Sequence, residues 1–450
     1  MAHHTVPSGY ERLAERLNRF PQGAPPSDLL FRILKMLMTE KEAWLVSSLP
    51  IKPFTAAKAA RAWKMDPPSA ERTLEELSGR ALLVDFEVNG SRVYVLPPPM
   101  AGFFEFSLMR VRDDIDQKAL SELFYLYLNV EEDFIVDLFT RGETQLGRPF
   151  VHEPALTREN LVHVLPWELA SEVVKAASTR AVGLCYCRHK MKHLGRACDA
   201  PLDICMTFGA AAGSLIRHGF AREADAAECL DLLQEAWDRG LVQLGENVRE
   251  GVSFICNCCP CCCEGLLALR RFPGMISVQT TGFVPAIDPR LCTGCGRCVK
   301  ACPVGAVELT LQGRDAHRGT AVLDEGRCLG CGLCVRSCAQ GAAELKPREK
   351  RVITPLNGSH RIVLMAIERG KLQNLIFDNQ VLWSHRALAG VLGVILSLPP
   401  VKRALASEQV RSRYLEKLIT IVQGSSSKAG PSGGPEEQAP GREGRVFRND

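Results

Sequence analysis

A cysteine pattern that occurs twice constrains this 450-residue chain more than any other feature. The pattern is C-x2-C-x2-C-x3-C, and its second copy begins 36 residues after the first. The eight cysteines are Cys292, Cys295, Cys298, Cys302, Cys328, Cys331, Cys334 and Cys338. Each copy places three thiols on a tight loop and the fourth on the helix that we expect to follow. The glycines between the thiols let backbone N–H groups approach a bound group without a Cβ in the way. Thiols at this spacing predict a pair of metal centres.

The two copies resemble the dicluster 4Fe–4S ferredoxin domain, which would cover residues 274–348. The resemblance implies two repeated β-loop-helix-β units and two 4Fe–4S clusters with crossed ligands. One cluster would take Cys292, Cys295, Cys298 and Cys338, and the other Cys328, Cys331, Cys334 and Cys302. Ala339 stands where the family usually has proline, but this difference removes no ligand.

Residues 181–273, which we expect to form a cysteine-rich domain, contain eleven further cysteines, and ten of these are candidate metal ligands. The ten are Cys185, Cys187, Cys198, Cys205, Cys256, Cys258, Cys259, Cys261, Cys262 and Cys263. The segment Ala181 to Cys187 reads as a strand, so Cys185 and Cys187 should project from the same face. Consecutive cysteines such as Cys258 and Cys259 point to opposite sides of an extended chain. All six thiols of residues 256–263 therefore cannot bind one metal unless the backbone turns strongly, and Pro260 supplies one break.

We expect a further iron–sulfur cluster in this domain, because electrons that reach the ferredoxin-type clusters need somewhere to go. Structural zinc and a redox thiol are the alternatives. A disulfide framework is disfavoured, since the N-terminus shows no export signal and the expected compartment is reducing. His189 and His193 are expected to be solvent-facing helix residues in preference to ligands. Arg188 could donate hydrogen bonds to a cluster, and Cys229 is expected to lie in the core.

Residues 24–100 predict a winged-helix-like domain. Helices are expected from Ser27, from Thr55 and over Ser69 to Ser78, and Asn89-Gly90 predicts a tight hairpin. Counting outward from that turn pairs Phe86 with Val93 and Val84 with Val95. The expected reading helix carries Glu71, Glu75 and Glu76 against Arg72, so we expect it to contact protein in preference to DNA. The basic residues Lys58, Arg61 and Lys64 on the preceding helix keep a redox-sensing transcription regulator as an alternative.

The fold class that we expect is multidomain α+β. Its segments are a lead-in (1–23), the winged-helix-like domain (24–100), a helical region (101–180), the cysteine-rich domain (181–273), the ferredoxin-type domain (274–348), C-terminal helices (349–423) and a disordered tail (424–450). Within them we expect a helix from Ala221 to Arg239 and a hairpin over 241–256. The whole arrangement is similar to a bacterial and archaeal family of 4Fe–4S proteins with a winged-helix-like N-terminus, a CxCR segment and a CNCCxCCC segment. That resemblance implies the cofactor class and leaves the reaction open.

The predicted function is that of an electron-transfer protein that works with redox partner proteins, or of the electron-transfer subunit of an oxidoreductase. The chain shows no phosphate loop, dinucleotide fingerprint or nucleophile elbow, so no catalytic residue is predicted. A net charge of +4 is too small to indicate nucleic acid. The most apolar stretch, residues 387–400, is shorter than the roughly 20 residues of a membrane span. We therefore expect a cytoplasmic protein without a transmembrane helix.

Overall fold

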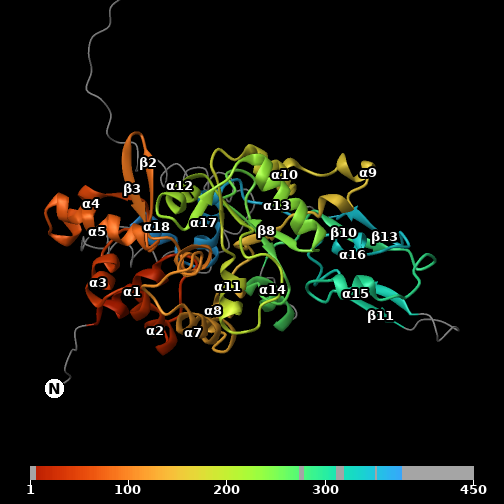
Figure 1. Cartoon of the computed structure of the whole chain (residues 1–450), viewed down its shortest axis with the longest axis horizontal. Helices are drawn as coiled ribbons and strands as arrows, with labels where there is room; N and C mark the ends of the chain where they lie inside the picture. The colour runs from red at the N-terminus through yellow and green to blue at the C-terminus, as the bar shows by residue number, and fades with distance from the viewer. Residues whose placement is uncertain (1–6, 273–277, 311–318, 350–351, 378–450) are drawn as a thin grey trace, which may run out of the picture.

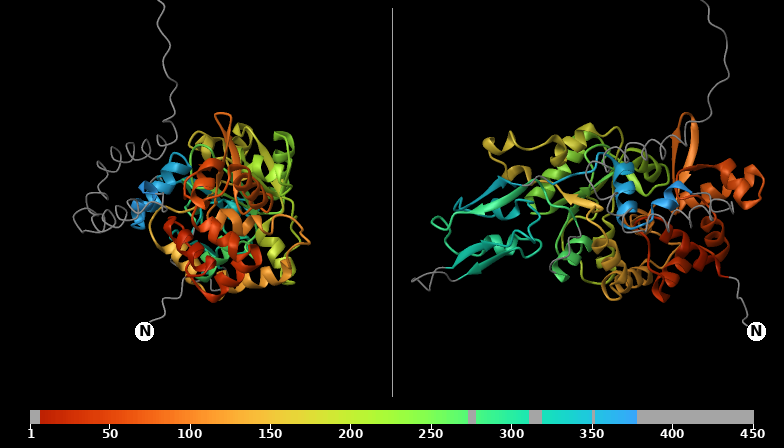
Figure 2. Two further views of the ribbon diagram at one scale, coloured as in Figure 1. Left: turned by 90° about the vertical axis from the view of Figure 1, so that its left-hand side faces the viewer. Right: turned by 180° about the vertical axis from the view of Figure 1, so that it is seen from behind.

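The computed structural model describes residues 7–272, 278–310, 319–349 and 352–377. Helices from the N-terminal part of the chain form one end of an elongated molecule, and the segment with the repeated cysteine pattern forms the other (Figure 1). A sheet and its helices lie between them, and the views in Figure 2 show the same order from behind. The protein thus combines helices with several small sheets, which confirms the expected α+β class at this level.

The N-terminal part contains five helices and a three-stranded sheet with the strand order β1-β3-β2. Its elements are α1 (Gly9–Arg19), α2 (Asp28–Leu37), α3 (Glu40–Ser47), β1 (Phe54–Thr55), α4 (Ala56–Trp63), α5 (Pro67–Gly79), β2 (Val84–Val88) and β3 (Ser91–Val95). The Ser27 side chain caps α2 by accepting a hydrogen bond from the backbone N–H of Leu30. The hairpin has the predicted register, with Phe86 opposite Val93 and Val84 opposite Val95. Asn89 and Gly90 both adopt positive φ, as the two-residue turn requires.

A helical segment joins this part to the sheet. It comprises α6 (Phe104–Phe106), α7 (Gln117–Asn129) and α8 (Asp133–Thr140). Phe104 packs against Phe124 and Phe134, with ring centroids 5.0 and 6.1 Å apart, and these rings belong to the same buried cluster as the N-terminal helices. The N-terminal part is therefore continuous with the segment that follows it.

The central sheet has six strands in the order β4-β8-β9-β6-β5-β7, and every neighbouring pair is antiparallel. Its strands are β4 (Gly147–Pro149), β5 (Arg180–Gly183), β6 (Cys205–Phe208), β7 (Ala221–Glu223), β8 (Val242–Glu246) and β9 (Phe254–Cys258). The helices associated with it are α9 (Arg158–Leu161), α10 (Ala170–Ala176), α11 (Tyr186–His193), α12 (Gly209–Arg217), α13 (Ala226–Asp238) and α14 (Glu264–Arg271). The predicted hairpin is confirmed as the pair β8–β9.

Two expected elements were wrong in part. The strand predicted from Ala181 to Cys187 ends at Gly183, and Cys187 lies instead on α11. The helix predicted from Ala221 to Arg239 is divided, because its first residues pair with β5 as strand β7 and the helix begins only at Ala226. Asp225 caps that helix by accepting from the backbone N–H of Glu228. In both cases a tertiary contact overrides the local pattern.

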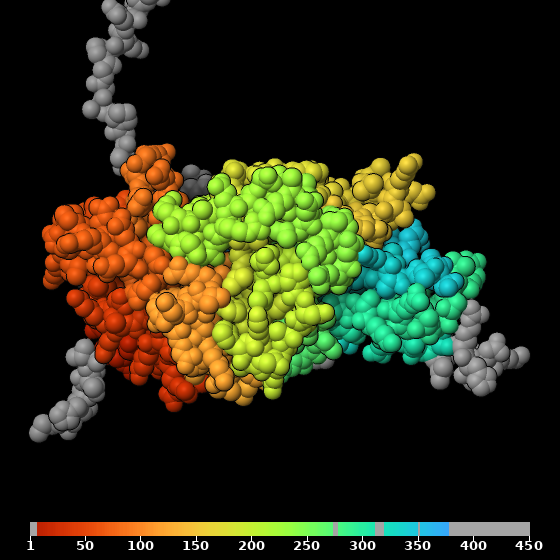
Figure 3. Space-filling model, viewed as in Figure 1, coloured from red at the N-terminus to blue at the C-terminus, as the bar shows by residue number. Residues whose placement is uncertain are grey.

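The repeated cysteine pattern folds as two two-stranded antiparallel sheets, and a short helix lies between the two strands of each copy. Strand β10 pairs with β13, and β11 pairs with β12. The elements are β10 (Phe283–Ile287), α15 (Arg297–Ala301), β11 (Val307–Thr310), β12 (Thr320–Leu323), α16 (Leu333–Arg336) and β13 (Ala343–Pro347). This unit projects from the sheet at one end of the molecule (Figure 3). The strands expected on the flanks of each copy are confirmed.

Two helices follow, α17 (Gly358–Glu368) and α18 (Leu372–Ile376), with Gly370 between them as predicted. The remainder of the helices expected up to residue 423, the apolar stretch 387–400 and the tail 424–450 lie outside the described residues. Within the part of the chain that the structure describes, no helix combines the length and apolar character needed to cross a bilayer.

Candidate metal centres

Backbone donors surround the cysteines of the repeated pattern. The backbone N–H of Ala306 donates to Cys302 Sγ at 3.1 Å, and that of Gly330 donates to Cys328 Sγ at 3.3 Å. The N–H of Ala321 lies 3.5 Å from Cys292 Sγ. Hydrogen bonds to sulfur favour the thiolate over the thiol, and a thiolate is the form that binds iron. The loops therefore suit cluster ligands.

Two glycines make these loops possible. A Cβ added to Gly294 would come within 2.2 Å of the carbonyl oxygen of Gly319, and one added to Gly330 within 2.1 Å of that of Phe283. Both glycines also have positive φ. Only glycine allows each cysteine loop to lie this close to the neighbouring backbone.

In the structure, Cys302 of the first copy lies beside the cysteines of the second copy. Burial, together with the nearby thiolates of Cys328 and Cys302, raises the pKa of Cys331 to about 12. Burial and the charge of Cys302, together with other neighbouring thiolates, likewise raise the pKa of Cys334. In the first copy, burial raises the pKa of Cys298 most, and the charges of Cys292 and Cys295 raise it by smaller amounts. The structure thus brings the last cysteine of the first copy to the first three cysteines of the second.

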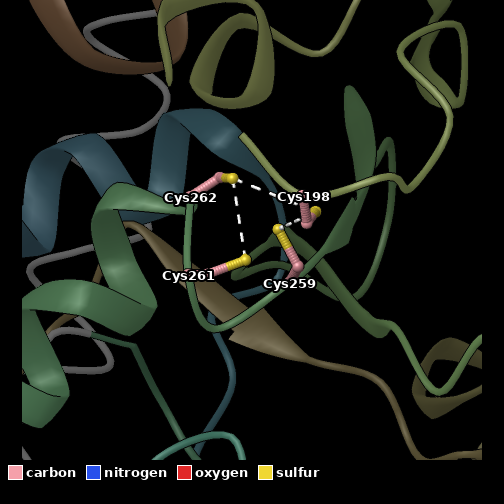
Figure 4. Close-up of side chains that lie close together, drawn as sticks. All are labelled: Cys198, Cys259, Cys261 and Cys262. Carbon is pink, nitrogen blue, oxygen red and sulfur yellow. Dashed lines mark hydrogen bonds between the residues drawn. The ribbon is translucent and has the colours of Figure 1, made fainter. Parts of the chain in front are cut away.

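The ten candidate cysteine ligands of residues 181–273 divide into two groups. The four-cysteine group consists of Cys198, Cys259, Cys261 and Cys262, whose sulfur atoms all lie within 4.8 Å of one another (Figure 4). The distances are 3.5 Å from Cys198 to Cys259, 3.7 Å from Cys261 to Cys262 and 4.0 Å from Cys262 to Cys198. Among the residues that the structure describes, this is the group of metal-binding side chains that comes closest together.

The remaining six cysteines line one cavity of about 190 Å³, which Cys259 and Cys262 of the four-cysteine group also line. This six-cysteine group consists of Cys185, Cys187, Cys205, Cys256, Cys258 and Cys263. Apolar side chains such as Met100, Phe106 and Met109 complete the wall. The cavity is therefore a thiol-rich site with a largely apolar wall.

The thiols of the six-cysteine group are in contact as a chain, and their pKa values alternate. Contact with the Cys205 thiol, then burial, raises the pKa of Cys185, and contact with Cys263, then burial, raises that of Cys187. The Cys205 and Cys258 thiols lower the pKa of Cys256 to about 6. The Cys187 and Cys258 thiols hold the pKa of Cys263 well below its usual range. Without a cation, ionising one thiol raises the pKa of the next, so all six can be thiolates only around a metal.

Two buried cations lie between the groups. Arg188 is only 1% exposed, and its Nη2 lies 3.6 Å from Cys259 Sγ and 3.2 Å from the carbonyl oxygen of Asn257. Lys190 is fully buried and forms an ion pair with Glu264, which directly follows Cys263. Burial lowers the pKa of Lys190 to about 8, and the nearby thiolates of Cys187, Cys262 and Cys263 oppose this by favouring its charged form. These cations offset part of the negative charge that metal-bound thiolates carry.

We expected Cys185 and Cys187 to face the same way because both would lie on one strand. The strand assignment was wrong. Cys185 precedes the first turn of α11 and Cys187 lies within that turn, yet both face the cavity. The prediction that His189 faces solvent was also wrong, because it is 5% exposed and its Nδ1 lies 2.7 Å from the carbonyl oxygen of Leu108. Cys229 is fully buried with Leu233 and Trp237, as predicted.

Sequence reasoning missed three acidic and basic side chains at these sites. Lys190 and Glu264 looked like ordinary helix residues, because the sequence gives no sign of their burial. Glu105 also lines the cavity, although it lies far away in the chain. Burial raises the pKa of Glu105 to about 7, against hydrogen bonds from the backbone N–H groups of Ala101 and Gly102.

Comparison with known proteins identifies the class of one part of the chain. Residues 291–342 match the family of 4Fe-4S dicluster domains, and this range contains all eight cysteines of the repeated pattern. The protein therefore carries a ferredoxin-type 4Fe–4S domain, which confirms the expected cofactor class. No match was found among curated proteins or among solved structures.

Proposed function

We propose that the protein transfers single electrons through two 4Fe–4S clusters in residues 274–348 and a further iron–sulfur cluster in the six-cysteine group. The observation that carries this proposal is a shared core. Cys328 and Cys331 of the second copy lie in the same buried cluster as Cys258 and Cys263 of the six-cysteine group. Two sites that share one buried cluster lie close together, and electron transfer between them requires this proximity.

The proposed ligand sets of the ferredoxin-type domain are crossed. Cys302 completes the set of Cys328, Cys331 and Cys334, and Cys338 completes that of Cys292, Cys295 and Cys298. The position of Cys302 beside the second copy supports the first of these sets. Clusters held there would supply one-electron chemistry with little rearrangement, because the charge spreads over several irons and sulfurs.

The sites follow an order from the surface inward. Cys295 of the first copy is exposed, whereas the first three cysteines of the second copy are buried. The six-cysteine cavity lies beyond the second copy. We infer that a redox partner protein docks near the first copy and that the cavity lies at the other end of the relay.

The six-cysteine group offers more thiolates than one cube takes, since a 4Fe–4S cluster binds four cysteines. The two extra thiols can hydrogen-bond to a cube or bind a larger cluster. The apolar wall is compatible with both arrangements, because ionised thiolates that contact no cation are unfavourable in a region of low dielectric.

We propose that residues 24–100 form a winged-helix-like domain that contacts protein. After α2, the order of α3, β1, α4, α5 and the β2–β3 hairpin supports this assignment. Glu71, Glu75 and Glu76 of α5 are all exposed, and Arg92 of the hairpin pairs with Glu75 at 3.2 Å. A DNA phosphate would meet carboxylates on this helix.

A role as electron-transfer subunit of an oxidoreductase is compatible with the same relay.

Metal and sulfide analysis of the full chain, purified without oxygen, tests the proposal. Three cubes would give about 12 irons and about 12 sulfides per chain. Cys205→Ser should lower both counts by about four and leave the low-temperature EPR signals of the ferredoxin-type clusters in place. Cys229→Ser is the matched control, since Cys229 touches neither group. An iron content of about eight that Cys205→Ser leaves unchanged would refute the further cluster.

A further inference from the structure

We propose that the four-cysteine group, Cys198, Cys259, Cys261 and Cys262, binds a single tetrahedral Zn²⁺ ion. This site goes beyond the proposed function, because Zn²⁺ is redox-inert and cannot take part in electron transfer. It also differs from the expectation that the whole cysteine-rich domain serves iron–sulfur chemistry.

The sulfur spacing carries the inference. Four sulfurs at about 2.3 Å from one zinc ion, at the corners of a tetrahedron, lie about 3.8 Å apart. The three recorded distances of 3.5, 3.7 and 4.0 Å lie around this value. A cube spreads its cysteines further, because each one binds a different iron. The cysteines of the ferredoxin-type domain and of the six-cysteine group, all of which are described, show no comparably close set of four.

The surroundings suit a structural ion. Four thiolates and Zn²⁺ have a net charge of −2, and the buried Arg188 faces this charge through Cys259 Sγ at 3.6 Å. Arg188 is itself held by the carbonyl oxygens of Pro201 and Asn257, one beside each ligand-bearing segment. It therefore acts as an outer partner that positions and neutralises the site.

The ligands come from two segments that need a connection. Cys198 lies on the loop between α11 and β6, and the other three lie on the turn between β9 and α14, where Pro260 ends the strand. One ion would join these segments across 60 residues of chain, which is what structural zinc sites do. Cys261 is exposed, so the metal can enter from solvent, while Cys259 and Cys262 are buried.

Zinc, iron and sulfide are to be counted together on the full chain, expressed with iron in excess and purified without oxygen. The wild type should contain about one zinc per chain, and Cys261→Ser and Cys198→Ser should each lose it while iron and sulfide stay within error. Cys229→Ser should keep both metals. X-ray absorption at the zinc edge of the wild type should show four sulfur neighbours at about 2.3 Å, and this measurement does not depend on whether a variant folds.

Two results would overturn the proposal. Loss of about four irons with their sulfide from Cys261→Ser would make the group a cube, and one iron without sulfide would replace zinc by a mononuclear iron site. The relay is tested separately by Cys205→Ser, which touches only the six-cysteine group. Failure of the zinc site is therefore distinguishable from failure of the proposed function.

Discussion

The buried ion pair between Lys190 and Glu264 should stabilise the protein only as a pair. Lys190 is 0% and Glu264 2% exposed, and the other recorded partner of the carboxylate is Asn129 Nδ2 at 3.0 Å. Lys190→Met would leave Glu264 buried with that single hydrogen bond. Removing one partner of a buried ion pair costs about 3–5 kcal/mol, because the other charge remains without compensation.

The double variant Lys190→Met/Glu264→Gln should recover most of this loss. The glutamine can still accept from Asn129, and the methionine can pack against the Tyr125 ring, over which the ammonium now lies at 5.6 Å. Replacing a whole buried pair by neutral groups of similar size is close to neutral. We expect the double variant to lie within about 1 kcal/mol of the wild type.

Thermal unfolding of the full chain, followed by tryptophan fluorescence without oxygen and at one scan rate, measures the effect. A loss of about 3–5 kcal/mol corresponds to roughly 6–20 °C in Tm at about 2–4 °C per kcal/mol. Lys175→Met is the control, since that lysine is exposed and its pair with Glu172 should contribute less than about 1 kcal/mol. The reasoning is refuted if Lys190→Met lowers Tm no more than this control, or if the double variant is no more stable than the single one.

Three further outcomes are expected. Because Cys302 is assigned to the second cluster, the double variant Cys302→Ala/Cys328→Ala should lose no more iron than Cys328→Ala alone. The double variant Cys302→Ala/Cys292→Ala should instead damage both clusters. The reverse pattern in iron counts would contradict the crossed assignment. Asp85 is 1% exposed, and although burial opposes its ionisation, hydrogen bonds from His218 and Ser214 and the charges of His218 and Arg217 hold its pKa well below the usual range. Asp85→Asn should therefore lower stability by about 2 kcal/mol at pH 7, and the difference from wild type should persist down to about pH 4 and close only below it; a difference that closed well above pH 4 would contradict this assignment. Random-sequence DNA should show no salt-sensitive micromolar binding in a gel shift, and binding that disappeared when Lys58, Arg61 and Lys64 were replaced would favour a transcription regulator.

The strands and loops of the repeated cysteine pattern could be predicted from the sequence. Its cysteines lie close together in the chain, so the spacing defines the loops, and Gly294 and Gly330 indicate where the backbone must come close. The hairpin of residues 84–95 was equally accessible, because Asn89-Gly90 specifies the turn and the turn specifies the register. These are local features, and local reasoning is sufficient for them.

The division of the ten candidate cysteine ligands of residues 181–273 could not be predicted, because it depends on contacts between distant segments. Strand β9 pairs with both β8 and β6, and these pairings bring Cys256 close to Cys205, 51 residues earlier in the chain. The early end of strand β5 also had no local signal. The backbone N–H of Cys185 donates to the carbonyl oxygen of Leu202 in place of a strand partner, and the chain then turns into α11.

The two groups of cysteines share one turn of the chain, and this arrangement links their chemistry. Cys258 and Cys263 belong to the six-cysteine group and their immediate neighbours Cys259 and Cys262 to the four-cysteine group, and all four line the same cavity. A zinc ion bound by Cys259 and Cys262 would therefore fix where Cys258 and Cys263 lie. Positioned thiolates need less rearrangement when the charge on a cluster changes, which favours fast electron transfer. A redox-inert ion beside the relay thus has a physical role, since it keeps the wall of the cavity rigid without accepting the electron.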